Sequence, residues 1–436
     1  MSRAVALLLL PALFAGPPRP RSAGGSGPGD TLTVLYEASG VRVLHRYAPA
    51  SDIVAVRLYL LGGSQQLTER TAGIETLLLR ASGLGTELFP GAEAHRAMDR
   101  TGSVVILEPE LDWTVFGFTS LAADLDVAWS VFADRLVHPT LSEQGVMHAR
   151  ARLLSEARRR YTEPDARLNA IAMQSLFEGH PYALDPEGTE ASLTGLTAED
   201  LKTYAHAQMV TSRMLLAIVG NVTRARVESL VTATLGHLPR GTYRWALPQP
   251  PAKARPRWLI EHRLIPTTYV LGLFAGPPPT SHSYWAFRVA TALLSSQLNH
   301  AIRSERGLSY AAYAPFRESA IPVGGAYLST PKPDRALMLM VDQIRELRNQ
   351  PIDYFGLSRF IDSFSFDYLA ENATSDGQAD FLARAELYLG GYQHGDEFSK
   401  RLHSVSPDDI LRAAGLYMTA IQFAYLGDTT RMHGHW

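Results

Sequence analysis

Residues 73–86, GIETLLLRASGLGT, read as a short helix that runs into a glycine-rich stop. Its apolar middle has the length of a short helix, with Gly73 at its start and a glycine-rich stop at its end. Thr76 and Arg80 stand four residues apart, and side chains at that spacing share one face of a helix. The stretch therefore predicts a short helix that brings positions 76 and 80 together.

Composition places the chain among ordinary globular proteins. It has 436 residues, 46% of them hydrophobic and 19% charged, with a formal net charge of −2. This length allows two or three domains and a sizeable core. No basic stripe stands out, so no nucleic-acid partner is expected. The absence of cysteine from the sequence excludes disulfides, thiolate metal sites and a cysteine nucleophile.

The N-terminal residues predict export. Arg3 precedes a short apolar run over residues 4–16, which is the pattern of a secretory signal. The run is shorter than the roughly 20 apolar residues that cross a bilayer, so no membrane span is expected in the mature chain. We interpret residues 1–31 as a signal peptide and flexible linker and expect a periplasmic location. A mitochondrial presequence is the alternative, because Arg19 and Arg21 are present and no acidic residue occurs this early.

A proline-rich segment divides the rest of the chain. Residues 238–258 contain five prolines and no long apolar run, which is typical of a stiff, extended connector. The connector separates an N-terminal domain, residues 32–237, from a C-terminal domain, residues 259–430. Residues 431–436 form a short tail.

The two domains repeat one pattern. Thr197 is followed three residues later by Asp200, then by a helix and a buried strand, and Ser406 with Asp409 begins the same series in the second domain. A hydroxyl and an acid at this spacing cap the free N–H groups of a helix start. The repeat predicts an α+β fold of two tandem homologous domains, each a mostly antiparallel sheet with helices packed on one face. Two unrelated α+β domains are the alternative.

Several landmarks in order carry a family resemblance: residues 58–86, 150–160, 180–201 and 298–313. With them, the chain resembles the insulinase, pitrilysin and mitochondrial-processing-peptidase family of zinc proteases, the inverzincins. The resemblance covers nearly all of the predicted mature chain. It implies two tandem α+β domains, in subunits that close face to face around a chamber.

The family's metal site implies specific positions in this chain. It consists of H-x-x-E-H on a helix and a distant glutamate. Two histidines at i and i+4 bind Zn²⁺, and the glutamate between them deprotonates a bound water. The flanking glycines place Thr76 and Arg80 at the histidine positions and Leu79 at the glutamate. The distal ligand position falls on Glu156, the one position of the four that is retained.

This replacement predicts an inactive zinc site. Leu79 cannot accept a proton, and Arg80 is a permanent cation without a lone pair to donate. We therefore expect no metal and no cofactor on this chain. As a hypothesis, Arg80 replaces the lost positive charge and forms an ion pair with Glu156 that keeps the old site folded. The alternative is that these residues have simply drifted.

No other catalytic centre is apparent in the sequence. No two histidines repeat the H-x-x-x-H spacing, and His433 and His435 stand alone near the C-terminus. His180 lies in the HPY landmark and is expected to make a structural hydrogen bond. There is no G-x-S-x-G elbow, no phosphate-binding loop and no dinucleotide glycine pattern after a strand.

A second set of residues matches the family's substrate-binding pair. In RSERGLSY, Arg303 and Tyr310 are framed by Gly307 and Leu308. The resemblance implies that this arginine and tyrosine bind the substrate backbone and stabilise the oxyanion, for which a fixed cation and a phenol donor are suited. The alternative is that Arg303 caps its helix and Tyr310 packs in the sheet.

Together these features resemble the non-catalytic subunit of a bacterial heterodimeric zinc protease. The resemblance implies a partner with an intact H-x-x-E-H motif, zinc on that partner, and an extended peptide substrate. One alternative is a non-proteolytic peptide-binding or structural core-type subunit. A second is a lone active metallopeptidase, which requires a different register of the motif.

Overall fold

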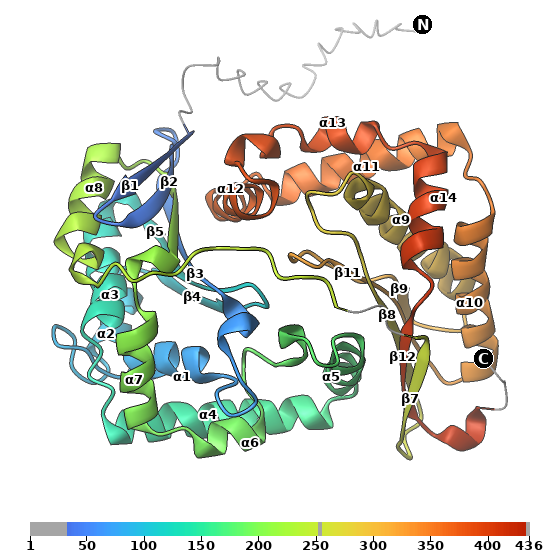
Figure 1. The fold of residues 1–436 in the computed structure, drawn as a ribbon, viewed down its shortest axis with the longest axis horizontal. Coiled ribbons are helices and arrows are strands. Elements are labelled where there is room, and N and C mark those ends of the chain that lie inside the picture. The colour runs from blue at the N-terminus through green and yellow to red at the C-terminus, as the bar shows by residue number, and fades with distance from the viewer. Residues whose placement is uncertain (1–32, 252–254, 433–436) are drawn as a thin grey trace, which may run out of the picture.

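The structure, a computed structural model, describes residues 33–251 and 255–432. These residues form two halves, each built on one sheet with long helices packed against it (Figure 1). The predicted signal peptide and linker, residues 1–31, and the two tail histidines, His433 and His435, lie outside the described residues. No described helix is long and apolar enough to span a bilayer.

The N-terminal sheet has the order β1-β2-β6-β3-β5-β4. Its pairs are antiparallel except β2 with β6, which is parallel. The last strand of this half thus inserts between two early ones. The strands are β1 (Thr33–Ala38), β2 (Val41–Tyr47), β3 (Ile53–Leu61), β4 (Val104–Pro109), β5 (Trp113–Leu121) and β6 (Met214–Gly220).

The C-terminal sheet repeats that topology. Its order is β10-β11-β8-β12-β7, with β9 also paired to β11, and only β12 with β7 is parallel. Here too the last strand lies between the first strand of the half and the next. The strands are β7 (Arg257–His262), β8 (Thr268–Ala275), β9 (Ala311–Tyr313), β10 (Phe316–Arg317), β11 (Val323–Thr330) and β12 (Gln422–Gly427).

The helices follow the same duplication. The capping boxes predicted at Thr197–Asp200 and Ser406–Asp409 are both present, at the starts of α7 and α14. In the N-terminal half the helices are α1 (Ile74–Ser82), α2 (Glu93–Arg100), α3 (Leu125–Val137), α4 (Glu143–Thr162), α5 (Pro164–Leu176), α6 (Glu190–Gly195), α7 (Ala198–Gln208) and α8 (Arg224–Ala233). In the C-terminal half they are α9 (Ser283–Leu298), α10 (Pro333–Asn349), α11 (Tyr354–Glu371), α12 (Ser375–Leu389), α13 (Phe398–His403) and α14 (Pro407–Tyr417).

Each sheet is covered on one face by its own helices, as the sequence predicts. The second face is covered by one helix from the other half, which the sequence did not reveal. Leu382 and Tyr388 of α12 join the cluster that contains Tyr59 and Trp113 of the N-terminal sheet. Reciprocally, α5 packs on β8 and β12 of the C-terminal sheet (Figure 1). The halves therefore interlock through burial of apolar surface.

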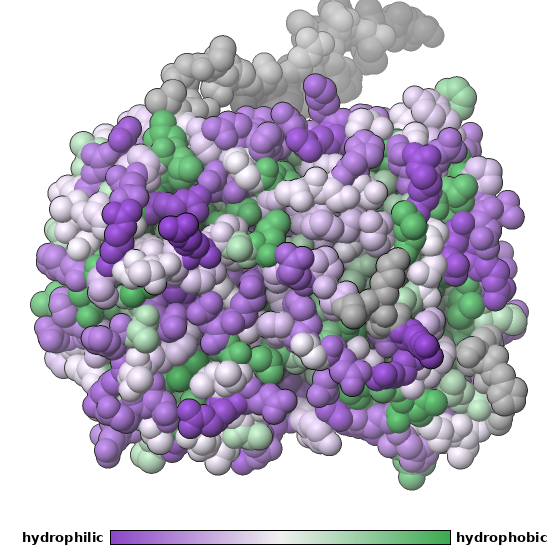
Figure 2. Space-filling model, viewed as in Figure 1, coloured by the Kyte–Doolittle hydropathy of each residue, from purple (hydrophilic) through white to green (hydrophobic). Residues whose placement is uncertain are grey.

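Ion pairs reinforce this interlocking. Arg57 of β3 lies 2.7 Å from Asp376 of α12, and Arg167 of α5 lies 2.8 Å from Glu261 of β7. The connector between the halves also packs, because the Trp245 indole N–H donates to the Leu387 carbonyl. The last two residues of the predicted connector already belong to β7. The surface in Figure 2 is largely hydrophilic, with apolar groups in scattered patches.

Candidate functional site

The helix predicted around residue 76 is α1, and it is held at both ends. Gly73 precedes it with φ of 83°, a conformation that favours glycine. A Cβ on Gly73 would lie 2.7 Å from the Gly188 Cα, so the loop before α6 packs directly on this helix start. The helix lies against α4, which carries Glu156. Positions 76, 80 and 156 are therefore neighbours, as the family register requires.

A buried ion pair that the sequence analysis missed fixes the first turn of α1. Glu75 accepts from the Arg213 guanidinium at 3.0 Å and from the Tyr204 hydroxyl at 2.9 Å. Arg213 is 1% exposed and also donates to the Leu61 carbonyl. Such a pair is stable only while both partners remain, because either charge alone would be buried without compensation. No signal in the sequence connects positions 75 and 213.

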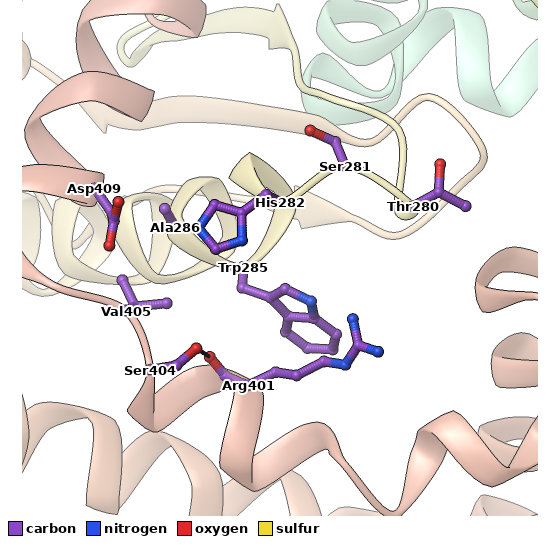
Figure 3. A pocket seen from close by; sticks show the side chains of 9 residues that line it. All are labelled: Thr280, Ser281, His282, Trp285, Ala286, Arg401, Ser404, Val405 and Asp409. Atoms are coloured by element: carbon purple, nitrogen blue, oxygen red, sulfur yellow. Dashed lines mark hydrogen bonds between the residues drawn. The ribbon is translucent and has the colours of Figure 1, made fainter.

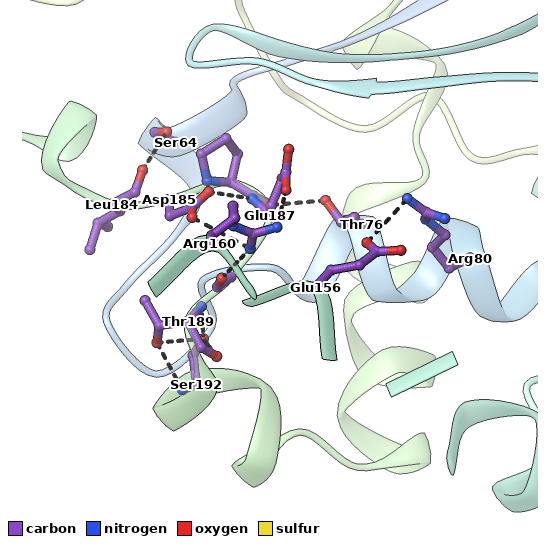
Figure 4. A network of polar contacts seen from close by, with 12 residues as sticks. Ser64, Thr76, Arg80, Glu156, Arg160, Leu184, Asp185, Glu187, Thr189 and Ser192 are labelled. Carbon is purple, nitrogen blue, oxygen red and sulfur yellow. Dashed lines mark hydrogen bonds and ion pairs between the residues drawn. The ribbon is translucent and has the colours of Figure 1, made fainter. Parts of the chain in front are cut away.

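Thr76 and Leu79 have structural roles. Thr76 is 1% exposed, and its hydroxyl donates to the Pro186 carbonyl at 2.8 Å (Figure 4). Leu79 is also 1% exposed and belongs to the main core of the N-terminal half. One position of the family motif thus binds a loop, and the other packs with apolar neighbours.

The ion pair predicted between Arg80 and Glu156 is present. Arg80 Nη2 lies 3.6 Å from Glu156 Oε2 (Figure 4). Arg152 Nε lies 3.4 Å from Glu156 Oε1. The pair is less buried than expected, because the two side chains of Arg80 and Glu156 are 35% and 27% exposed. Water screens such a pair, so its contribution to stability is about 0–1 kcal/mol.

Arg135 lies beneath this pair. It is buried, and its guanidinium donates to the Leu79 carbonyl at 2.6 Å and to the Ser82 hydroxyl at 3.3 Å. Burial and, to a lesser extent, the positive charge of Arg80 together lower the pKa of Arg135 to about 10. The site therefore contains a second, buried cation close to Arg80.

The residues at this position do not fit the zinc ion that the family implies. The Thr76 hydroxyl is engaged with the loop, the Leu79 side chain has no donor atom, and Arg80 is a cation that repels a dication. Glu156 alone provides one carboxylate, whereas zinc sites have three or four protein ligands. We derive no step through a metal on this chain.

The loop over residues 184–189 closes one side of the site. Arg160 of α4 forms ion pairs with Glu187 and, at 3.6 Å, with Asp185, and it donates to the Gly188 carbonyl at 2.9 Å (Figure 4). Thr76 contacts the same loop through Pro186. The sequence indicates a turn here through its Asp-Pro pair, but not the arginine that binds it.

The second predicted set, Arg303 and Tyr310, is brought together by the structure. Arg303 lies in a short π-helical turn, Asn299–Ser304, that continues α9. Its guanidinium carbon lies 4.9 Å from the centre of the Tyr310 ring, a cation–π contact. Tyr310 is 83% exposed, so the alternative in which it packs in the sheet is wrong.

The pair leaves its polar atoms available. Among the described residues, no hydrogen bond, ion pair or ring contact joins Arg303 or Tyr310 to Thr76, Arg80 or Glu156. The first set lies in the N-terminal half and the second in the C-terminal half. An exposed guanidinium and phenol held side by side can both donate to one carbonyl oxygen or to the negative charge that develops on it.

Other expected features are structural. The His180 ring accepts from the Tyr182 backbone N–H at 3.1 Å and lies 3.0 Å from the Gln249 carbonyl, as predicted for this landmark. A pocket of about 260 Å³ lies between the start of α9 and the α13–α14 turn. Figure 3 shows its lining, which includes Arg401 and Asp409. Arg401 binds Glu397, and Asp409 caps α14. The charged groups of this pocket therefore already have partners.

Comparisons with known proteins agree with this geometry. The family model described as "Insulinase (Peptidase family M16)" matches residues 42–189. The model described as "Peptidase M16 inactive domain" matches residues 195–359. The two matches cover both halves of the chain.

Individual relatives are distant. The chain is 27% identical over 288 residues to an uncharacterized zinc protease of Mycobacterium leprae, covering 63% of each chain. It is 22% identical over 262 residues to the mitochondrial-processing peptidase subunit beta of Blastocladiella emersonii, covering 59% of this chain and 55% of that one. The matches thus span about three fifths of these relatives.

The fold is closely similar to a solved structure. A protease from Helicobacter pylori aligns with a TM-score of 0.83 at 18% identity, covering 91% of this chain and 99% of that one. The two family models and this structural match together span both halves of the chain. The chain belongs to the insulinase family, peptidase family M16.

Proposed function

We propose that this chain is the non-catalytic subunit of a heterodimeric zinc protease. Its partner has an intact H-x-x-E-H motif and holds the zinc ion. This chain provides half of the chamber wall and presents Arg303 and Tyr310 to an extended peptide. The proposal includes export to the periplasm, as the N-terminal sequence predicts.

The observation that carries this proposal is the contrast between the two sets of residues. In the N-terminal half, the side chains at the metal positions are engaged in packing, a loop contact and an ion pair. In the C-terminal half, Tyr310 is 83% exposed and held against Arg303. An exposed donor pair without a local hydrolytic centre suits an active site completed by another subunit.

The chemistry required of this pair is limited. Peptide hydrolysis places negative charge on the carbonyl oxygen of the scissile bond, and donors aimed at that oxygen stabilise the transition state. The Arg303 guanidinium is a fixed cation, and the Tyr310 hydroxyl donates one hydrogen bond. The contact between the two side chains restricts both before substrate arrives, which lowers the entropic cost of binding.

An edge strand is suited to hold the peptide. β4 is the last strand in the order of the N-terminal sheet and pairs with β5 on one side. Its first residues, Val104 and Val105, are 57% and 38% exposed. An extended peptide adds to such an edge through main-chain hydrogen bonds, with little dependence on its side chains.

Co-expression with the partner tests the proposal. The partner should be a protein with the H-x-x-E-H motif whose gene neighbours this one, and the assay is cleavage of a fluorogenic peptide by the purified complex. We expect Arg303→Ala with Tyr310→Ala to abolish most activity while the complex still forms. Arg345→Ala, an exposed arginine of α10, is the matched control and should leave activity unchanged.

A complex whose activity is unaffected by the double substitution would contradict this role. It would favour the alternative of a structural or peptide-binding subunit without a part in hydrolysis. Analytical ultracentrifugation of the same variants separates loss of pairing from loss of catalysis.

A further inference from the structure

The former metal position carries an excess of positive charge that the ion pair with Glu156 does not neutralise. Arg80, Arg135 and Arg152 lie there, and the ion pairs join two of them to the single carboxylate of Glu156. Arg135 donates to a carbonyl and a hydroxyl rather than to an acid. The neighbouring Asp134 is engaged with the Leu88 backbone N–H and with His138. Three guanidinium groups against one carboxylate give +2, and the adjoining Arg160 with Glu187 and Asp185 brings the local charge to about +1.

Arg80 is incompletely satisfied. Its contact with Glu156 is long, at 3.6 Å, and is made through one terminal nitrogen. Its Nε–H is buried and has no hydrogen-bond acceptor among the described residues. A planar guanidinium with free donors binds carboxylates through two parallel hydrogen bonds. The side chain is 35% exposed, so an added ligand can reach its exposed part but not the buried Nε–H.

We propose that the converted metal position is a carboxylate-binding site, in which Arg80 and Arg152 bind an acidic group of a peptide and Glu156 competes for them. The ligand is either the free C-terminus of a peptide or an aspartate or glutamate side chain. The inference that this carboxylate belongs to a peptide in the shared chamber rests on the proposed function. Binding of the carboxylate itself does not, because it needs only residues of this chain.

Glu156 gives the site a built-in competitor. One of its oxygens accepts a hydrogen bond from Arg152, and the other forms the longer ion pair with Arg80, so an incoming carboxylate must displace these contacts. Because both side chains are partly exposed, the resident pair is weak and can be exchanged. Removing the competitor should therefore strengthen binding, whereas removing Arg80 should weaken it. These opposite signs distinguish a site from general attraction to a basic surface.

The test uses the purified chain without its partner and three fluorescent peptides of neutral sequence. One ends in a carboxylate, one in an amide, and one in an amide with a single internal aspartate. Fluorescence anisotropy measures their affinities at low ionic strength, where exposed charges are least screened. We expect a peptide with a carboxylate to bind about tenfold more tightly than the neutral amide, as for a hydrogen bond to a charged group. The peptide that binds more tightly than the neutral amide identifies the source of the carboxylate.

Substitutions at Arg80 and Glu156 distinguish a carboxylate site from general attraction to a basic surface. Arg80→Gln should remove the preference for the carboxylate, and Glu156→Gln should increase it about threefold, as for loss of one weak ion pair. The matched controls are Arg158→Gln and Glu190→Gln, which change the same charges in another exposed ion pair involving α4. These should leave the preference unchanged.

Equal affinity for all three peptides would overturn the proposal. So would an Arg158→Gln variant that weakens binding as much as Arg80→Gln does, because attraction would then be non-specific. Failure here leaves the subunit role intact, since that role is tested through Arg303 and Tyr310 in the complex. Thermal unfolding of each variant checks that the fold is retained.

Discussion

The two candidate regions of this chain, one around α1 and one around Arg303 and Tyr310, differ in how their polar atoms are used. At the start of α1, Thr76 binds a loop carbonyl, and Glu75 is buried against Arg213. Beyond the turn that follows α9, Tyr310 is exposed to solvent and its ring contacts Arg303. One region has become part of the framework, and the other retains an exposed donor pair. The comparison indicates that substitutions in the first should affect stability and those in the second should affect activity.

The largest effect is expected at the buried pair beneath α1. Arg213→Met removes the cation and leaves the Glu75 carboxylate buried without a partner. The free energy of unfolding should fall by about 3–5 kcal/mol, as for other broken buried pairs. Urea denaturation of the purified chain measures this. A loss below about 1 kcal/mol would show that the first region is not the framework described here.

A smaller effect, on activity only, is expected at Tyr310. Tyr310→Phe keeps the ring that contacts Arg303 but removes the hydroxyl donor. Loss of one oxyanion donor lowers kcat by about 10²–10³-fold, so kcat/KM of the complex should fall by a similar factor. Urea denaturation of this chain should be unchanged, because the side chain is 83% exposed. A change in stability without a change in activity would show that Tyr310 has a structural role, which contradicts the contrast between the two regions.

Thr76→Val tests the loop contact. It preserves the shape of the side chain but removes the hydrogen bond to Pro186. We expect a loss of about 1 kcal/mol, the net contribution of one part-buried hydrogen bond. Increased protease cleavage within residues 184–189 is the second readout. Unaltered cleavage and stability would mean that the other contacts of the loop, including those of Arg160, hold it without Thr76.

The smallest stability effect is expected at Arg80. Arg80→Gln should change the free energy of unfolding by about 0–1 kcal/mol, because the pair with Glu156 is partly exposed. Thermal unfolding at low and high salt measures this and its screening. A loss comparable with that of Arg213→Met would mean that the pair is structural, and the proposed carboxylate site would then lose its basis.

Much of the fold could be predicted from local signals. Capping boxes at Thr197 and Ser406 require only a hydroxyl and an acid three residues apart, and both are present. The exchange of α5 and α12 between the halves could not be predicted, because it depends on the distant apolar surfaces that each helix meets. The same reason explains why Glu75 and Arg213, 138 residues apart, were missed.

For the candidate site, too, some features could be predicted from the sequence and others could not. The positions of Thr76, Leu79, Arg80 and Glu156 follow from spacing and from the resemblance, and the Arg80–Glu156 ion pair could be predicted from their charges. Its exposure could not, because exposure depends on how α1 and α4 meet. Arg135 lies on α3 and reaches the site from beneath, which spacing does not reveal.

The central claim is that this chain completes the active site of a partner. The most direct measurement titrates the purified chain into the purified H-x-x-E-H subunit and follows peptide cleavage. We expect little cleavage by the partner alone, a rise that saturates at one chain per partner, and no rise with the Arg303→Ala, Tyr310→Ala chain. Equal cleavage by the partner with and without this chain would contradict it.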